Sequence, residues 1–131
     1  MTCPYRMLHT CIRVLDLEKS EQFYRQAFGF DIVRRKDYPD HRFTLSYMAP
    51  PGGGFELELT YNYDQQEPYQ IGNGYSHLAV AVNDLEASHR HHQALGLDPK
   101  PLKGLPGQPP RFYFVADPDG YLVEVVSGSV D

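Results

Sequence analysis

Two histidines and two glutamates occupy matching places in the two halves of this chain, and together they could hold a metal ion. The segment HTCIRVLDLEKS begins at His9, and HLAVAVNDLEAS begins at His77, 68 residues later, with six identical residues in twelve. Glu58 in GGGFELEL and Glu124 in PDGYLVEV each lie four residues after the last glycine of a turn. Imidazole and carboxylate donors without thiolate suit a borderline or hard divalent ion in a six-coordinate site completed by water.

Each repeated segment predicts a strand that leads into a helix. LHTCIRV and SHLAVAV are short, apolar and rich in β-branched residues, as strands are. Asp16 and Asp84 follow these runs, where they can cap the helices that come next. The helical stretches end at Gly29 and Gly96, and glycine suits a helix C-terminus because it adopts the left-handed conformation cheaply.

Further strands are expected after each helix, with turns at PPGGG and DPDG. In the first half they fall at 31–37, 42–49 and 55–62; in the second they fall at 109–117 and 121–127, with one more somewhere in 97–105. The pattern therefore predicts the element order βαβββ in each half. We expect one α+β domain with mixed sheets over residues 1–131, built from two βαβββ repeats at about 5–66 and 73–127.

Strand alternation places each glutamate on a defined face of its strand. Glu58 shares a face with Glu56 and Thr60, while Glu124 shares one with Leu122 and Val126. A carboxylate in an apolar strand is costly unless a charged group meets it. If the halves pack about a pseudo-twofold axis, both histidines and both glutamates converge and leave two positions open for substrate oxygens.

The runs LHTCIRVLDLEKSEQFY, ELELTYN, GYSHLAVAV and DPDGYLVEVV, in this order, strongly resemble glyoxalase I (lactoylglutathione lyase) of the vicinal oxygen chelate superfamily. The resemblance runs from about residue 7 to 127. It implies the glyoxalase fold and metal-dependent isomerisation of the methylglyoxal–glutathione hemithioacetal to S-lactoylglutathione. It also implies His9, Glu58, His77 and Glu124 as the metal ligands. In the family the second-half glutamate is the base, so Glu124 is expected in that role, with Glu58 assisting or only ligating.

Cofactor and partner expectations follow from the same resemblance. Glutathione would be the co-substrate, and the family commonly forms homodimers whose metal site takes ligands from both chains. His9 and Glu58 would then face the second pair, His77 and Glu124, of the partner. The short chain resembles the bacterial class that prefers nickel or cobalt, with zinc as the alternative.

Four residues match substrate-contact positions of the family. Arg13 and Asn62 correspond to residues that bind the γ-glutamyl end of glutathione, where donors meet a carboxylate. Lys103 and Arg111 are available for the glycyl carboxylate. The loop 101–110 is longer and richer in proline than the usual bacterial one, which leaves the thiol open.

Other functions of this superfamily remain as alternatives. They are a glyoxalase-like enzyme for a different thiol, an extradiol dioxygenase, a thiol transferase that opens fosfomycin, and a metal-free drug-binding protein. A fourth protein ligand at Glu58 argues against the iron dioxygenase and the transferase, which use three. The cluster SHRHHQ also suggests metal, but His91 and His92 align with Phe23 and Tyr24 of the first helix, so we expect aromatic packing and a solvated neighbour, with His89 beside them.

Composition excludes several broad classes. The chain has 131 residues, a formal net charge of −5 and scattered basic residues, which does not favour nucleic-acid binding. No run of about 18 uncharged apolar residues occurs, and no signal-peptide pattern begins the chain, so we expect a cytoplasmic protein that does not bind membranes. Cys3 and Cys11 are too few for a disulfide framework and are expected to be free thiols.

Overall fold

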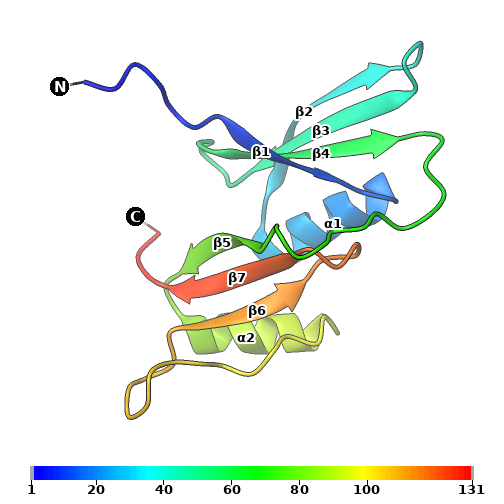
Figure 1. The fold of residues 1–131 in the computed structure, drawn as a ribbon. Helices are drawn as coiled ribbons and strands as arrows, with labels where there is room; N and C mark the ends of the chain where they lie inside the picture. The colour runs from blue at the N-terminus through cyan, green and yellow to red at the C-terminus, as the bar shows by residue number, and fades with distance from the viewer. Residues whose placement is uncertain (1, 131) are drawn as a thin grey trace. The chain divides into compact units, whose positions relative to one another are not determined.

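The computed structural model describes residues 2–130, and the chain divides into two compact units. Unit 1 runs to Tyr69, and unit 2 begins at Gln70. Unit 1 holds β1 (His9–Arg13), α1 (Leu17–Phe28), β2 (Asp31–Tyr38), β3 (Phe43–Ala49) and β4 (Glu56–Asn62), as Figure 1 shows. Unit 2 holds β5 (His77–Val82), α2 (Leu85–Ala94), β6 (Phe112–Ala116) and β7 (Leu122–Ser127).

Both units place their first strand beside their last strand. The sheet of unit 1 has the order β1-β4-β3-β2, with β1 parallel to β4 and the other pairs antiparallel. The sheet of unit 2 has the order β5-β7-β6, with β5 parallel to β7 and β6 antiparallel to it. Two mixed sheets with one helix each confirm the expected fold class.

Both helices begin as the sequence predicts, and α1 ends at the predicted Gly29; α2 ends at Ala94 with Leu95 as its cap, and the predicted Gly96 follows in the left-handed conformation with φ at 75°. The Asp16 carboxylate accepts the N–H of Lys19 at 3.1 Å, and the Asp84 carboxylate accepts that of Ala87 at 3.0 Å. Gly29 ends α1 in the left-handed conformation, with φ at 72°, and donates to the carbonyls of the last turn. Among the described residues, neither helix has the length and apolar character that crossing a bilayer requires.

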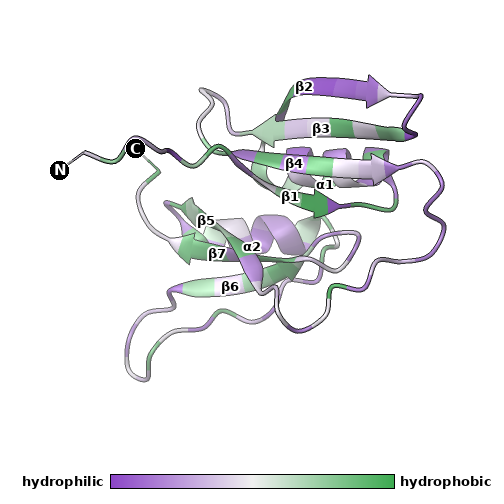
Figure 2. Cartoon of the chain, turned by 45° about the horizontal axis from the view of Figure 1, so that its top comes forward, coloured by the Kyte–Doolittle hydropathy of each residue, from purple (hydrophilic) through white to green (hydrophobic). Residues whose placement is uncertain are grey.

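Each helix covers one face of its own sheet. In unit 1, Leu57, Leu59 and Met48 are buried, together with Phe23 and Tyr24 of α1. In unit 2 the buried residues include Val123, Val125, Tyr113 and Val115 of the sheet with Leu85 and His92 of α2. The edge strand β2 is polar along most of its length, as the purple ribbon in Figure 2 shows.

The buried histidine of α2 behaves as the repeat predicts. His92 has no exposed surface, and its Nδ1 lies 2.7 Å from the Tyr113 hydroxyl, while His91 is exposed. His89 Nε2 lies 2.8 Å from the carbonyl oxygen of Lys100. The expected packing role of His92 is therefore confirmed.

The structure corrects one expected element, the strand in 97–105. Only two N–H groups there bond to β6: Lys100 donates to the Phe114 carbonyl at 2.8 Å, and Lys103 donates to the Phe112 carbonyl at 2.9 Å. Lys103 and Phe112 form an isolated bridge, so the segment contributes no strand. The physical reason is that Asp98 has a φ of 53°, outside the extended region, and that the two donors are three residues apart, whereas a ladder repeats every two.

Candidate metal-binding site

Glu58 and Glu124 lie at equivalent register positions in the two units. Glu58 of β4 is paired with Cys11 of β1, two residues after His9. Glu124 of β7 is paired with Ala79 of β5, again two residues after the histidine, His77. Because alternate residues of a strand share a face, each histidine projects from the same face of its sheet as the glutamate of its own unit.

In unit 1, His9 and Glu58 form a close pair on the sheet face opposite α1. His9 Nε2 lies 3.6 Å from Glu58 Oε1. The His9 side chain is 38% exposed and that of Glu58 is 12% exposed, so the pair stands at the surface of its unit with the carboxylate deeper. The His9 ring also meets the Tyr47 ring edge-on, with centroids 5.8 Å apart.

Hydrogen-bond donors surround the Glu58 carboxylate. Cys11 and Tyr47 stand beside it on β1 and β3, and the Thr60 hydroxyl donates to Oε2 at 3.5 Å. Desolvation raises the pKa of Glu58, but the hydrogen bonds from Cys11 and Tyr47 and the charge of His9 outweigh it and hold the pKa below its ordinary value. The same hydrogen bond, with desolvation, raises the pKa of Tyr47 to about 12. Glu58 is therefore favoured as a carboxylate, the form that binds a cation.

In unit 2, His77 and Glu124 form the matching pair. His77 Nε2 lies 3.3 Å from Glu124 Oε1. His77 Nδ1 lies 2.6 Å from the Ser76 hydroxyl, which can accept the Nδ1 proton and leave the Nε2 lone pair available for a metal. Phe114 meets the His77 ring edge-on at 5.1 Å between centroids and limits its rotation.

The donor atoms of each pair fit a divalent cation. Neighbouring ligands of one ion lie about 3 to 3.5 Å apart when the metal–ligand bonds are about 2.1 Å long, and the two pairs have separations of 3.6 and 3.3 Å. Among residues 2–130, no three or more His, Cys, Asp or Glu side chains gather closely enough to hold a metal on their own. Each unit therefore offers two ligands, and convergence of all four stays a prediction.

Comparison with known proteins assigns the family. Residues 6–125 match the model of the Glyoxalase/Bleomycin resistance protein/Dioxygenase superfamily. The chain is 42% identical over 127 residues to the lactoylglutathione lyase of Neisseria meningitidis serogroup A, covering 92% of this chain and 89% of the relative. It is 36% identical over 128 residues to a probable lactoylglutathione lyase of Vibrio cholerae, covering 93% and 90%. The chain belongs to the lactoylglutathione lyases of this superfamily.

A solved structure agrees with that membership. Glyoxalase I of Leishmania major, described as trypanothione-dependent, superposes with a TM-score of 0.83 and 33% sequence identity, covering 94% of this chain and 86% of that one. The expected family is confirmed, and the protein is an enzyme of the glyoxalase I type.

In this glyoxalase, Arg13 and Asn62 lie on the same face of unit 1 as His9. Arg13 is paired with Thr60 in the β1–β4 register, and Asn62 lies two residues beyond Thr60 on β4. The Asn62 amide nitrogen donates to the Tyr69 hydroxyl at 3.0 Å, which fixes the orientation of the amide. The two predicted substrate residues thus lie on adjacent strands, on the sheet face that holds the His9–Glu58 pair.

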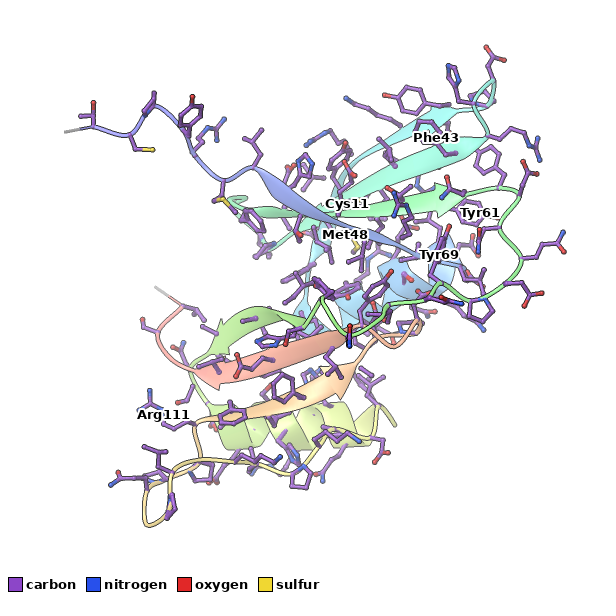
Figure 3. The ribbon with its side chains drawn as sticks, viewed as in Figure 1. Cys11, Phe43, Met48, Tyr61, Tyr69 and Arg111 are labelled. Atoms are coloured by element: carbon purple, nitrogen blue, oxygen red, sulfur yellow. The ribbon has the colours of Figure 1, made fainter. Side chains whose placement is uncertain are left out.

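Lys103 and Arg111 meet at the base of the proline-rich loop of unit 2. The Arg111 N–H donates to the Lys103 carbonyl at 2.7 Å. Gly104 is required in this loop, since a Cβ there would stand 2.7 Å from the Pro109 carbonyl oxygen. Arg111, labelled in Figure 3, lines a hollow in the surface of unit 2. The other lining residues are Leu105, Gln108, Pro109, Pro110 and Ser127.

Sequence reasoning missed the residues that support Glu58 in this glyoxalase. Tyr47 lies opposite Glu58 in the β3–β4 pair, and the Arg34 guanidinium stacks 3.9 Å above the Tyr47 ring while forming two 2.9 Å hydrogen bonds to Glu56. Cys11, labelled in Figure 3, was predicted only as a free thiol; it is free, and it also lies opposite Glu58 on β1, with its sulfur 3.1 Å from the Thr60 hydroxyl oxygen. The pairing of Tyr47 with Glu58 in the β3–β4 hairpin register would have revealed the first contact.

Proposed function

We propose that this enzyme isomerises the hemithioacetal of methylglyoxal and glutathione to S-lactoylglutathione in the cytoplasm, with a divalent metal ion, nickel or cobalt in preference to zinc. The observation that carries the proposal is the His–Glu pair repeated at the same register in both units. A drug-binding member of the fold would have no need for two such pairs. The lactoylglutathione lyases among the relatives give the reaction.

The two pairs serve one metal ion in this proposal. Each supplies one imidazole and one carboxylate, so two pairs give four ligands and leave two positions of a six-coordinate ion for the substrate oxygens. We assign His9 and Glu58 of one chain to the same ion as the second pair, His77 and Glu124, of another chain, which makes the active form a homodimer. When bound, the cation stabilises the negative charge that develops on the substrate oxygens as a proton leaves carbon.

Glu124 is the proposed base and acid. Its carboxylate takes the proton from the carbon that bears sulfur, and the carbon–hydrogen electron pair forms a double bond to the neighbouring carbon. The same carboxyl then returns the proton to that neighbouring carbon, while the hydroxyl proton passes between the two oxygens. Substrate and product are isomers, so no oxidant or reductant is consumed. Glu58 stays a carboxylate, consistent with its lowered pKa.

The ends of the thiol cofactor are assigned to four side chains. Arg13 and Asn62 would bind the γ-glutamyl carboxylate and amine, because they are side by side on the face of unit 1 that carries His9. Lys103 and Arg111 would bind the glycyl carboxylate, with the hollow beside Arg111 accepting the end of the peptide.

A second candidate is the same isomerisation with a thiol other than glutathione. It is favoured by the loop 101–110, whose prolines and close-packed Gly104 shape the hollow. One structural relative is described as trypanothione-dependent, which illustrates that the thiol varies among glyoxalases.

Metal reconstitution tests the proposed function. Protein stripped of metal is assayed for S-lactoylglutathione formation after addition of nickel, cobalt or zinc, together with Glu124→Gln. Activity is expected to return most strongly with nickel or cobalt, and Glu124→Gln is expected to bind metal but turn over at least about a hundredfold more slowly, the usual scale for loss of a general base. Stoichiometric metal binding without a rate for any thiol would contradict the proposal.

A further inference from the structure

Within the repeated framework, the residues next to the two glutamates differ in kind. Glu58 is flanked across the strands by Cys11 of β1 and Tyr47 of β3. Glu124 is flanked at the same register positions by Ala79 of β5 and Phe114 of β6. Every cross-strand neighbour of Glu58 therefore carries a hydrogen-bond donor, and every cross-strand neighbour of Glu124 carries none.

The residues along the same strand repeat this contrast. On β4, Glu58 stands between Glu56 and Thr60, and the Thr60 hydroxyl lies 3.1 Å from the Cys11 sulfur as well as bonding to Glu58. On β7, Glu124 stands between Leu122 and Val126, neither of which has a polar side chain. A carboxylate with hydrogen-bond donors on several sides is held more firmly in one orientation than a carboxylate whose neighbours, apart from one histidine, are apolar.

Tyr47 is the best-anchored of the donors to Glu58. Its side chain is 7% exposed, its ring lies under the Arg34 guanidinium at 3.9 Å and meets His9 edge-on, and Arg34 is fixed by two hydrogen bonds to Glu56. The Tyr47 side chain opposite Glu58 is therefore part of a rigid group. In unit 2, among the residues described, His77 is the polar partner found for the Glu124 carboxylate.

We propose that Tyr47, assisted by Cys11, is a positioning residue that fixes Glu58 as a permanent metal ligand, and that Phe114 at the equivalent position leaves Glu124 free to leave the metal and carry the proton. This inference rests on the proposed function, because it explains how two glutamates at the same register take different roles. The pair Tyr47 and Phe114 then specifies which half of the protein performs the proton transfer.

Two reciprocal substitutions test the inference, each altering one hydroxyl. Tyr47→Phe removes the donor from Glu58, and Phe114→Tyr introduces one beside Glu124. Tyr63→Phe is the matched control, since the Tyr63 hydroxyl, just after β4, bonds to Thr44 of β3 at 2.6 Å. Measurements are cobalt affinity against a chelator, the visible spectrum of the cobalt protein, and kcat and KM.

Tyr47→Phe is expected to lower cobalt affinity about tenfold or more, the usual scale for loss of a group that orients a ligand, and to alter the cobalt spectrum. Cys11→Ala should act in the same direction with a smaller effect. Phe114→Tyr is expected to keep or raise cobalt affinity but lower kcat about tenfold with little change in KM, because the added bond must loosen before each proton transfer. Tyr63→Phe should leave affinity and kcat within about twofold.

The inference is overturned if Tyr47→Phe binds cobalt as tightly as Tyr63→Phe does. It is also overturned if a folded Phe114→Tyr enzyme keeps the full kcat of the wild type. The two proposals fail separately. Without S-lactoylglutathione formation by the wild-type protein the proposed function is wrong, while the cobalt affinities still decide whether Tyr47 positions Glu58. With an active wild type and a neutral Tyr47→Phe, only the positioning role is wrong.

Discussion

Removing the Tyr113 hydroxyl is expected to destabilise unit 2 without altering the His77–Glu124 pair. Tyr113 has no exposed surface, and its hydroxyl oxygen lies 2.7 Å from both Ser88 Oγ and His92 Nδ1. Tyr113→Phe keeps the ring and deprives the buried His92 nitrogen of this partner. Ser88 is half-buried and can turn toward water.

The expected magnitude comes mainly from the histidine. A buried polar group that loses its partner costs about 1–3 kcal/mol, so a loss of about 2 kcal/mol in the free energy of unfolding is expected for Tyr113→Phe. With an unfolding entropy of about 2.1 cal/mol/K per residue, a chain of 131 residues should then melt about 7 °C lower.

Thermal unfolding of metal-free protein, followed by circular dichroism, measures this loss. Tyr61→Phe is the control, because no hydrogen bond of the Tyr61 hydroxyl is found among the residues the structure describes; its melting temperature should stay within about 1 °C. The double variant Tyr113→Phe, His92→Leu tests the cause. Removing both polar partners should recover part of the loss, since the hydroxyl and the imidazole that bond to each other are then both absent. An unchanged melting temperature for Tyr113→Phe, or a double variant that loses the full sum, would refute this reasoning.

Three further predictions concern the helix caps and the titration of the site. Asp16→Ala and Asp84→Ala should each lower the free energy of unfolding by about 1 kcal/mol in urea titrations, because each removes the acceptor of a first-turn N–H; no change in either would show that the cap bonds do not matter. The pKa of Glu58 is lowered in the folded state, so its stabilising contribution is present above the ordinary pKa of 4.5 and is lost as pH falls through the folded pKa. In metal-free protein, Glu58→Gln should therefore reduce the fall in the free energy of unfolding at acidic pH. An unchanged fall in this variant would contradict the lowered pKa. Folding raises the pKa of Tyr47 from 10.0 to about 12, so its contribution to the free energy of unfolding is present below pH 10 and is lost as pH rises through about 12. In an ultraviolet titration, Tyr47→Phe should lack the absorbance change of the tyrosine that ionises near pH 12. A titration curve identical to that of the wild type would count against the bond to Glu58.

The sequence was sufficient to predict the elements that carry the two His–Glu pairs. The repeat placed strands and helices correctly because the Asp caps, the glycines at the helix ends and the alternation in β4 and β7 are local features. The alignment of His92 with Tyr24 also predicted a buried position, which α2 confirms. The strand expected in 97–105 was wrong because the backbone leaves the extended conformation at Asp98, which the repeat does not reveal.

The support of Glu58 could not be predicted because it depends on register across strands. A shift of one residue in the β3–β4 hairpin would turn Tyr47 to the opposite face of the sheet. Arg34 reaches Tyr47 only because the β2–β3 register shifts between Ile32 and Arg34, and such an irregularity has no mark in the sequence. The donors around Glu58 therefore became visible only in the folded unit.

Complementation between two inactive variants tests the central claim most directly, which is that one metal ion is held by the His–Glu pairs of two chains. One variant carries His9→Ala with Glu58→Ala, and the other carries His77→Ala with Glu124→Ala. Each alone is expected to be inactive. After unfolding and refolding together with nickel, half of the dimers should be mixed, and each mixed dimer should hold one intact site, so about a quarter of wild-type S-lactoylglutathione formation should appear. No activity in the mixture, with mixed dimers demonstrated by differently tagged chains, would contradict a site shared between chains.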